Sequence, residues 1–76
     1  MEVAEAFGRA VKLRRTELGL NQEDLADKAV MGRSFLSGIE TGKKKATIDS
    51  VWKIATALRC KPSQLWATAE RLLEEA

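Results

Sequence analysis

Apolar residues recur along this chain at intervals of three and four, the spacing of one face of an α-helix. The first stripe consists of Val3, Phe7, Val11 and Leu18. It stops at Gly19, a residue type that commonly follows a helix end, so a first helix is predicted over about residues 2–18. Signals for strands are weak throughout the chain.

Two short helices, each with its own start signal, follow close together. Asn21 is a good N-terminal cap with Asp24 three positions later, a variant of the capping box, and predicts a helix over about residues 22–29. Three residues later, a third helix is expected over about residues 33–41. Its inward residues are Phe35, Leu36 and Ile39. The short connection holds the two helices at a sharp angle.

Two further helices are predicted in the rest of the chain. Thr47 can cap a fourth helix, and Pro62 suits the first position of a fifth helix over about residues 62–76. The fourth helix is expected to bury one face made of Ile48, Val51, Trp52, Ala55 and Leu58. The fifth carries a stripe of Leu65, Trp66, Ala69, Leu72, Leu73 and Ala76. The pattern predicts an all-α fold, a compact five-helix bundle that forms a single domain over residues 1–76.

The outward side of the third helix differs from an ordinary solvated helix surface. It carries Arg33, Ser34, Ser37, Gly38 and Thr41. Glu, Lys, Gln and Ala favour a surface helix, whereas Ser, Gly and Thr lower its stability and are short. Such a face fits a DNA major groove, where an Arg can bond guanine and a small Ser can reach a base edge or a phosphate. Unselected variation of a helix surface is the alternative interpretation.

Composition narrows the classes of function. One cysteine, Cys60, and no histidine argue against an intramolecular disulfide, a zinc site and Ser-His or Cys-His catalysis, and a buried thiol is expected for Cys60. We expect no enzyme activity, no cofactor, no metal and no small-molecule ligand. The chain has neither a signal-peptide pattern nor an apolar run near the ~20 residues of a membrane span, which favours a cytoplasmic protein.

Positive charge gathers in one part of the chain. Residues 30–61 carry seven Lys or Arg against two acidic residues, while the whole chain has a net charge of only +2. Such asymmetry suits a polyanionic partner on one face, although a charge cluster is also common on a solvated surface.

These segments together resemble a known family. LGLNQEDLADKA, the short turn after it, RSFLSGIETGKKK and TIDSVWKIATALRCKPSQLW are similar to the helix-turn-helix domain of the lambdoid phage repressor and Cro (XRE) type. Within that superfamily, RSFLSGIETG is similar to the recognition helix of controller proteins of restriction–modification systems, which are small dimeric regulators. The resemblance covers about residues 7–66. It implies a lambda repressor-like fold and double-stranded operator DNA as the partner.

The resemblance also implies roles for individual residues. Gln22, at the start of a helix, would bond a DNA phosphate through its amide and the helix N-terminus. Arg33, Ser34 and Ser37 would occupy the base-facing positions. The flanking DNA backbone would be lined by Thr41, Lys43, Lys44 and Lys45. For each lysine, a solvated loop is the alternative.

Arg15 and Glu40 are expected to form a structural ion pair. Arg15 continues the apolar stripe of the first helix, so it turns inward, where a charge needs a partner. Glu40 is the matching carboxylate in family members. Arg14, on the outer side of the same helix, is the expected phosphate ligand.

Several residues depart from the family pattern. Val30 stands where the family usually has a turn glycine, and a β-branched residue does not readily adopt a positive φ. A relaxed turn or a different path is therefore expected there. Gly32 replaces the usual polar cap, Phe35 replaces a frequent tyrosine, and Ala46 replaces a frequent proline.

The last helix predicts the mode of assembly. Its apolar strip runs further than a small core can cover, so a second copy is expected to cover it in a two-fold dimer, with help from the end of the fourth helix. The predicted dimer contacts are Leu65, Ala69, Leu72, Leu73 and Ala76. A frayed amphipathic tail is the alternative.

Two hypotheses for function follow. The first is a sequence-specific transcriptional regulator that binds a pseudo-palindromic operator as a homodimer, as a restriction–modification controller protein or a phage-type repressor does. The second is a protein-interaction module on the same scaffold, of an antirepressor or antitoxin-like kind, which docks a partner through its last helix. The basic segment beside a small polar face favours the first, because an interaction module does not need that combination.

Overall fold

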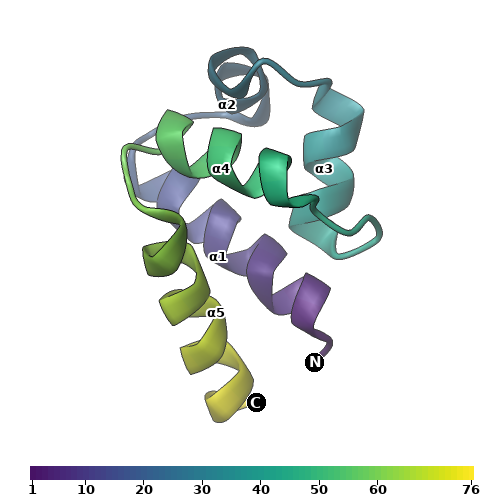
Figure 1. Cartoon of the computed structure of the whole chain (residues 1–76), viewed down its shortest axis with the longest axis vertical. Coiled ribbons are helices and arrows are strands. Elements are labelled where there is room, and N and C mark those ends of the chain that lie inside the picture. The colour runs from purple at the N-terminus through teal and green to yellow at the C-terminus, as the bar shows by residue number, and fades with distance from the viewer.

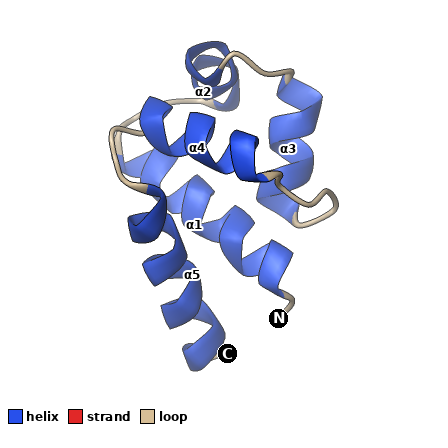
Figure 2. Ribbon diagram, viewed as in Figure 1, coloured by secondary structure: helices blue, strands red, loops and turns tan.

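Five α-helices and no strand make up the chain in the computed structural model, which describes all of residues 1–76 (Figures 1 and 2). In chain order they are α1 (Val3–Glu17), α2 (Gln22–Ala29), α3 (Arg33–Thr41), α4 (Ile48–Ala57) and α5 (Pro62–Glu75). The predicted all-α, five-helix fold is confirmed, and the predicted helix boundaries agree closely with the observed ones. None of the helices combines the length and the apolar character that a membrane span requires.

Local signals explain where the helices begin and end. The Asn21 side chain accepts a hydrogen bond from the Asp24 amide at 2.8 Å, and the Asp24 carboxylate accepts one from the Asn21 amide at 3.2 Å. This capping box satisfies backbone N–H groups that the first turn of α2 would otherwise leave free. Thr47 and Ser50 form the same arrangement at the start of α4. Gly42 ends α3 with a φ of 79°, a conformation that glycine adopts at little cost.

A shared apolar core holds the helices together. Its buried side chains include Phe7, Val11, Leu25, Leu36, Ile39, Ile54, Leu58 and Leu65. α1 runs through the middle of the molecule and packs against both α3 and α5 (Figure 1). Fully burying a Leu, Ile or Phe side chain contributes about 1.5–3 kcal/mol, so this shared core supplies most of the favourable free energy of folding.

The buried face predicted for α4 was wrong at two positions. The buried apolar residues of α4 and its C-terminal cap are Val51, Ile54, Ala55 and Leu58. Ile48 and Trp52 are instead 86% and 64% exposed. At about 100° per residue, the observed core face is centred between Val51 and Ile54, so Ile48 and Trp52 project past its edge.

The apolar strip of α5 also divides between two environments. Leu65 and Ala69 are buried in the core of the chain itself, so they are not available to a second copy, and the dimer contacts predicted for them were wrong. Leu72 and Leu73 are partly buried, and Ala76 is exposed. The dimer contacts at these last three positions stay a prediction.

Candidate nucleic-acid interface

Four side chains predicted to contact DNA meet in one place. Gln22, Arg33, Ser34 and Ser37 line a single surface hollow that has no apolar residue in its wall. Gln22 comes from the first turn of α2 and the other three come from the outward side of α3. The sharp turn between the two helices therefore brings the positive end of α2 beside a face of short polar side chains, a combination that suits an anionic, hydrogen-bonding partner.

Arg33 is the side chain best placed to interact with a partner at this hollow. It is exposed, and it belongs to none of the three ion pairs of the chain. Its guanidinium therefore keeps its N–H donors available, in the forked geometry that matches two acceptors on a guanine edge. Thr41 differs, because its hydroxyl donates within α3 to the carbonyl oxygens of Ser37 (3.1 Å) and Gly38 (3.2 Å). Thr41 can thus accept a hydrogen bond from a partner, but its hydroxyl proton is already donated within α3.

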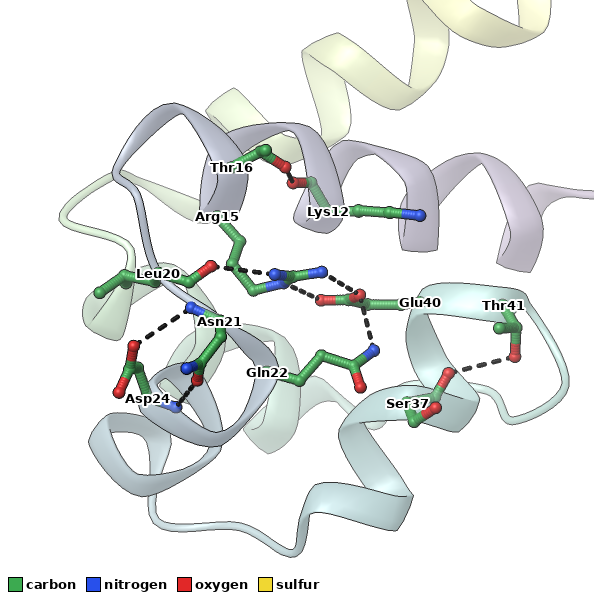
Figure 3. A network of polar contacts seen from close by, with 10 residues as sticks. All are labelled: Lys12, Arg15, Thr16, Leu20, Asn21, Gln22, Asp24, Ser37, Glu40 and Thr41. Atoms are coloured by element: carbon green, nitrogen blue, oxygen red, sulfur yellow. Dashed lines mark hydrogen bonds and ion pairs between the residues drawn. The ribbon is translucent and has the colours of Figure 1, made fainter.

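Beneath the hollow, a buried carboxylate joins three helices (Figure 3). Glu40 accepts a hydrogen bond from Arg15 Nε at 2.7 Å and another from Arg15 Nη2 at 3.0 Å. The Glu40 side chain is 2% exposed and that of Arg15 is 12% exposed, so the predicted structural pair is confirmed as a bidentate, largely buried ion pair. Arg15 Nη1 also donates to the carbonyl oxygen of Leu20 at 2.9 Å.

Gln22 belongs to the same network, which the sequence did not indicate. Its Nε2 donates to Glu40 Oε1 at 3.0 Å. Figure 3 shows the Gln22 side chain extending from α2 toward Glu40 on α3. One amide proton is thereby engaged and the orientation of the side chain is defined, while the second proton stays free for an acceptor. The phosphate contact of Gln22 stays a prediction, now with a defined donor direction.

Of the three lysines after α3, Lys44 is held against the helix. Its amide donates to the carbonyl oxygen of Gly38 at 3.0 Å, and its Nζ lies 5.8 Å from the centre of the Phe35 ring. A Cβ atom on Gly38 would lie only 2.8 Å from Cγ and Cδ of Lys44, so the missing side chain makes room for the lysine. Lys43 and Lys45 are exposed and form no ion pair.

The turn between α2 and α3 keeps a left-handed residue without a glycine. Val30 has φ 53° and ψ 57°, so the expectation of a relaxed turn or a different path was wrong. The amides of Val30 and Met31 donate to the carbonyl oxygens of Asp27 and Ala26, which closes the end of α2. A left-handed L-residue costs roughly 1–2 kcal/mol, and the tertiary contacts of α2 and α3 offset this cost.

Arg14 lies away from the hollow, at the end of α4. Its Nε donates to the carbonyl oxygen of Leu58 at 3.1 Å and its Nη2 to that of Arg59 at 3.4 Å. Its guanidinium thus satisfies carbonyl groups at a helix C-terminus, a role that the sequence did not indicate. The phosphate contact of Arg14 stays a prediction. Burial raises the pKa of the nearby Cys60 thiol although Arg14 opposes the shift, which keeps the thiol protonated and weakly nucleophilic.

Comparisons with known proteins agree with this geometry. A helix-turn-helix family model matches residues 11–65. The control protein C.BamHI of Bacillus amyloliquefaciens is 33% identical over 60 residues, which are 78% of this chain and 74% of that protein. The crystal structure of the restriction-modification controller protein C.AhdI from Aeromonas hydrophila is 35% identical with a TM-score of 0.80, over 82% of this chain and 94% of the other. The wild-type restriction-modification controller protein C.Esp1396I has a TM-score of 0.90 at 26% identity, over 100% and 99% of the two chains.

Proposed function

Because this chain belongs to the helix-turn-helix family of DNA-binding transcription regulators, we propose that it is a controller protein that binds a pseudo-palindromic operator as a homodimer. The observation that carries the proposal is the polar hollow formed by Gln22, Arg33, Ser34 and Ser37 beside a basic loop. C.BamHI is a control protein and C.AhdI is a restriction-modification controller protein, and the similarity to both supports the choice of regulator class.

Different side chains contact the DNA bases and the DNA backbone. Arg33 reads a guanine edge in the major groove through two hydrogen bonds, and Ser34 and Ser37 reach adjacent base edges or phosphates. Lys43 and Lys45 contact the flanking phosphates, which adds affinity without reading sequence. In a two-fold dimer the two copies of α3 enter successive major grooves about 34 Å apart.

The alternative, a protein-interaction module that docks a partner through α5, has less support. Two residues of the apolar strip on which it depends, Leu65 and Ala69, are already buried within the chain. It also offers no reason for an unpaired Arg33 beside small polar side chains. We further propose a cytoplasmic location, because the regulator must reach its operator.

Selection of duplexes from a random-sequence DNA library, followed by footprinting, tests the proposal. We expect the wild-type protein to enrich a sequence with two related half-sites. Arg33→Ala should weaken binding by about 1–3 kcal/mol and relax the preference at one position per half-site. Lys45→Ala is the matched control and should weaken all sequences alike. Failure to enrich any sequence, with a folded protein, would contradict the proposal.

A further inference from the structure

A cavity between α1 and α5 is separate from the proposed DNA interface. α1 and α5 pack against each other (Figure 1), and the turn between α4 and α5 adds Arg59 and Cys60 to the cavity wall. The volume of the cavity is about 400 Å³, which is within the range of small-molecule sites. None of the four residues of the polar hollow lines it. We call this feature the arginine cavity.

Three arginines gather in the wall of the arginine cavity: Arg14, Arg59 and Arg71. The wall contains one carboxylate, that of Glu17, whose Oε1 lies 3.9 Å from Nη1 of Arg14. Arg59 and Arg71 belong to none of the three ion pairs of the chain. The wall thus keeps two uncompensated positive charges, and their forked N–H donors match the oxygens of a phosphate or carboxylate.

Arg59 occupies a backbone position at which glycine is the usual residue. It follows the end of α4 with a φ of 55°, a left-handed conformation that strains any L-residue. The carbonyl oxygen of Arg59 accepts a hydrogen bond from Arg14 Nη2 at 3.4 Å, but every residue type supplies such a carbonyl. The turn itself therefore does not require the guanidinium, and a role of this side chain in binding accounts for its presence.

The rest of the wall suits an organic molecule that carries an anionic group. Leu13 is 50% exposed and lines the cavity together with the buried side chain of Leu65. Gln64 contributes a further donor, because its Oε1 accepts a hydrogen bond from the Lys61 amide at 2.7 Å. That bond orients the Gln64 side chain and leaves both of its amide protons free for a ligand.

We propose that the arginine cavity binds a small organic phosphate monoester, which combines a doubly charged phosphate group with an apolar body. Such a group carries a charge of about −1.5 to −2 at neutral pH, which matches the two uncompensated guanidiniums of Arg59 and Arg71. Its terminal oxygens accept hydrogen bonds from these arginines and from Gln64, and its apolar body contacts Leu13 and Leu65. The inference does not depend on the proposed function, because no residue of the polar hollow takes part.

Naphthyl phosphate is a suitable probe, because it joins a phosphate monoester to an apolar ring system. In calorimetric titration of the full chain at moderate salt, we expect one binding site per chain. The bound probe should also raise the melting temperature, since it binds the folded state alone. Inorganic phosphate lacks the apolar body and naphthyl sulfate carries a single charge, so both should bind more weakly. Naphthyl phosphate that does not bind, or that binds no better than these two ions, would overturn the proposal.

Arg59→Gly is the most informative variant, because it removes the guanidinium and also relaxes the backbone. It should weaken binding of naphthyl phosphate by about ten- to hundredfold, the usual effect of losing a hydrogen bond to a charged group, and keep or raise the melting temperature. Arg71→Gln should weaken binding to a similar extent. Arg9→Ala, which removes the same charge from α1 outside the cavity, is the matched control and should leave binding unchanged.

Glu17→Gln should have the opposite effect on affinity. It removes the one carboxylate of the wall, so naphthyl phosphate should bind more tightly than to wild-type protein. A general loss of structure cannot produce a gain in affinity. Weaker binding by Glu17→Gln, or unchanged binding by both Arg59→Gly and Arg71→Gln, would overturn the proposed site.

Cys60 reports where the probe binds. It is the one thiol of the chain and lies in the wall of the cavity. Bound naphthyl phosphate should therefore slow the alkylation of Cys60 by iodoacetamide, which mass spectrometry measures. Arg59→Gly should lose this protection at the same probe concentration. Alkylation of wild-type protein that does not change with saturating probe would place the ligand elsewhere and overturn the proposal.

DNA binding distinguishes this cavity from a contact to the phosphates of the duplex. Arg59→Gly should bind the selected duplex as wild-type protein does, and Arg33→Ala should bind naphthyl phosphate as wild-type protein does. If Arg59→Gly and Arg71→Gln lose affinity for the duplex and retain it for naphthyl phosphate, these arginines contact the DNA backbone and the cavity is not a phosphate monoester site. Failure of the DNA selection, with binding of naphthyl phosphate intact, would contradict the proposed function and leave this site standing.

Discussion

At the scale of single residues, Glu40 links the scaffold of the molecule to its proposed DNA interface. It lies on α3 and accepts hydrogen bonds from Arg15 of α1 and Gln22 of α2. The hydrogen bond to Glu40 and its negative charge raise the pKa of Arg15, although burial acts in the opposite direction. The guanidinium therefore stays charged, and Gln22 is oriented by a group that the core holds in place.

Arg15→Ala should lower the free energy of unfolding by roughly 3–5 kcal/mol, because it leaves a buried carboxylate without its cation. Urea unfolding at neutral pH measures the effect. Arg9→Ala is the control: Arg9 pairs with Glu5 at 3.1 Å on an exposed helix face, and such pairs contribute about 0.3–0.5 kcal/mol. Arg15→Lys keeps the charge and loses the bidentate geometry, so it should lower the free energy of unfolding by an amount between those of Arg15→Ala and Arg9→Ala. Equal effects of Arg15→Ala and Arg9→Ala would show that the buried ion pair contributes no more to stability than the exposed one.

At the scale of elements, α1 and α3 approach each other closely at Gly8. A Cβ atom on Gly8 would lie 2.2 Å from the carbonyl oxygen of Ile39 and 2.6 Å from that of Glu40. These are backbone atoms of a packed helix, which cannot move aside as a side chain can. Gly8 thus sets the distance between the central helix and the proposed recognition helix.

Gly8→Ala should destabilise the fold by about 1–3 kcal/mol or more, as overpacking of a tight contact does. Gly38→Ala is the matched control, because the nearest atoms to its Cβ would be those of the flexible Lys44 side chain, and alanine is favoured over glycine in a helix by about 0.5–1 kcal/mol. We expect Gly38→Ala to keep or raise the melting temperature and, by moving Lys44 away from Phe35, to weaken DNA binding. If Gly8→Ala were as stable as Gly38→Ala, the close approach of α1 to α3 would not require glycine at position 8.

At the scale of the whole molecule, charge is distributed unevenly. Arg33 and the loop 43–45 contribute positive charge at the proposed interface, while Glu70, Glu74 and Glu75 lie along the C-terminal half of α5. This arrangement orients the molecule in the field of a polyanion and increases the rate of productive encounter with DNA. It also makes affinity depend on the counterions that the lysines release.

Binding to the selected duplex should therefore weaken steeply with salt. Each phosphate contact contributes a slope of about −0.9 in log K against log salt, so a dimer with two or three lysine contacts per copy should give roughly −4 to −5. Titrations between low and moderate salt, followed by fluorescence anisotropy, measure the slope. Lys45→Ala should reduce its magnitude by nearly two in the dimer. An affinity that does not change with salt would argue for the interaction module.

Signals that act within a few residues were readable from the sequence alone. The helical periodicity, the capping boxes at Asn21 and Thr47 and the stop at Gly42 each depend on neighbours less than two turns away. The number and positions of the helices followed from them. The polar face of α3 was readable for the same reason, whereas the partner of Arg15 was identified only by resemblance to a family.

Only the tertiary structure decided which apolar and polar side chains face inward. The apolar stripe on α4 is wider than the face that the core covers, so Ile48 and Trp52 stay exposed. On α5, the packing of the helices buries Leu65 and Ala69 within the chain. The same packing directed Arg14 to the end of α4, drew Gln22 to Glu40 and held Val30 in a left-handed conformation. Periodicity along one helix gives the direction in which a side chain points from the axis of that helix. Which group the side chain then contacts depends on residues distant in the chain and on cooperative packing.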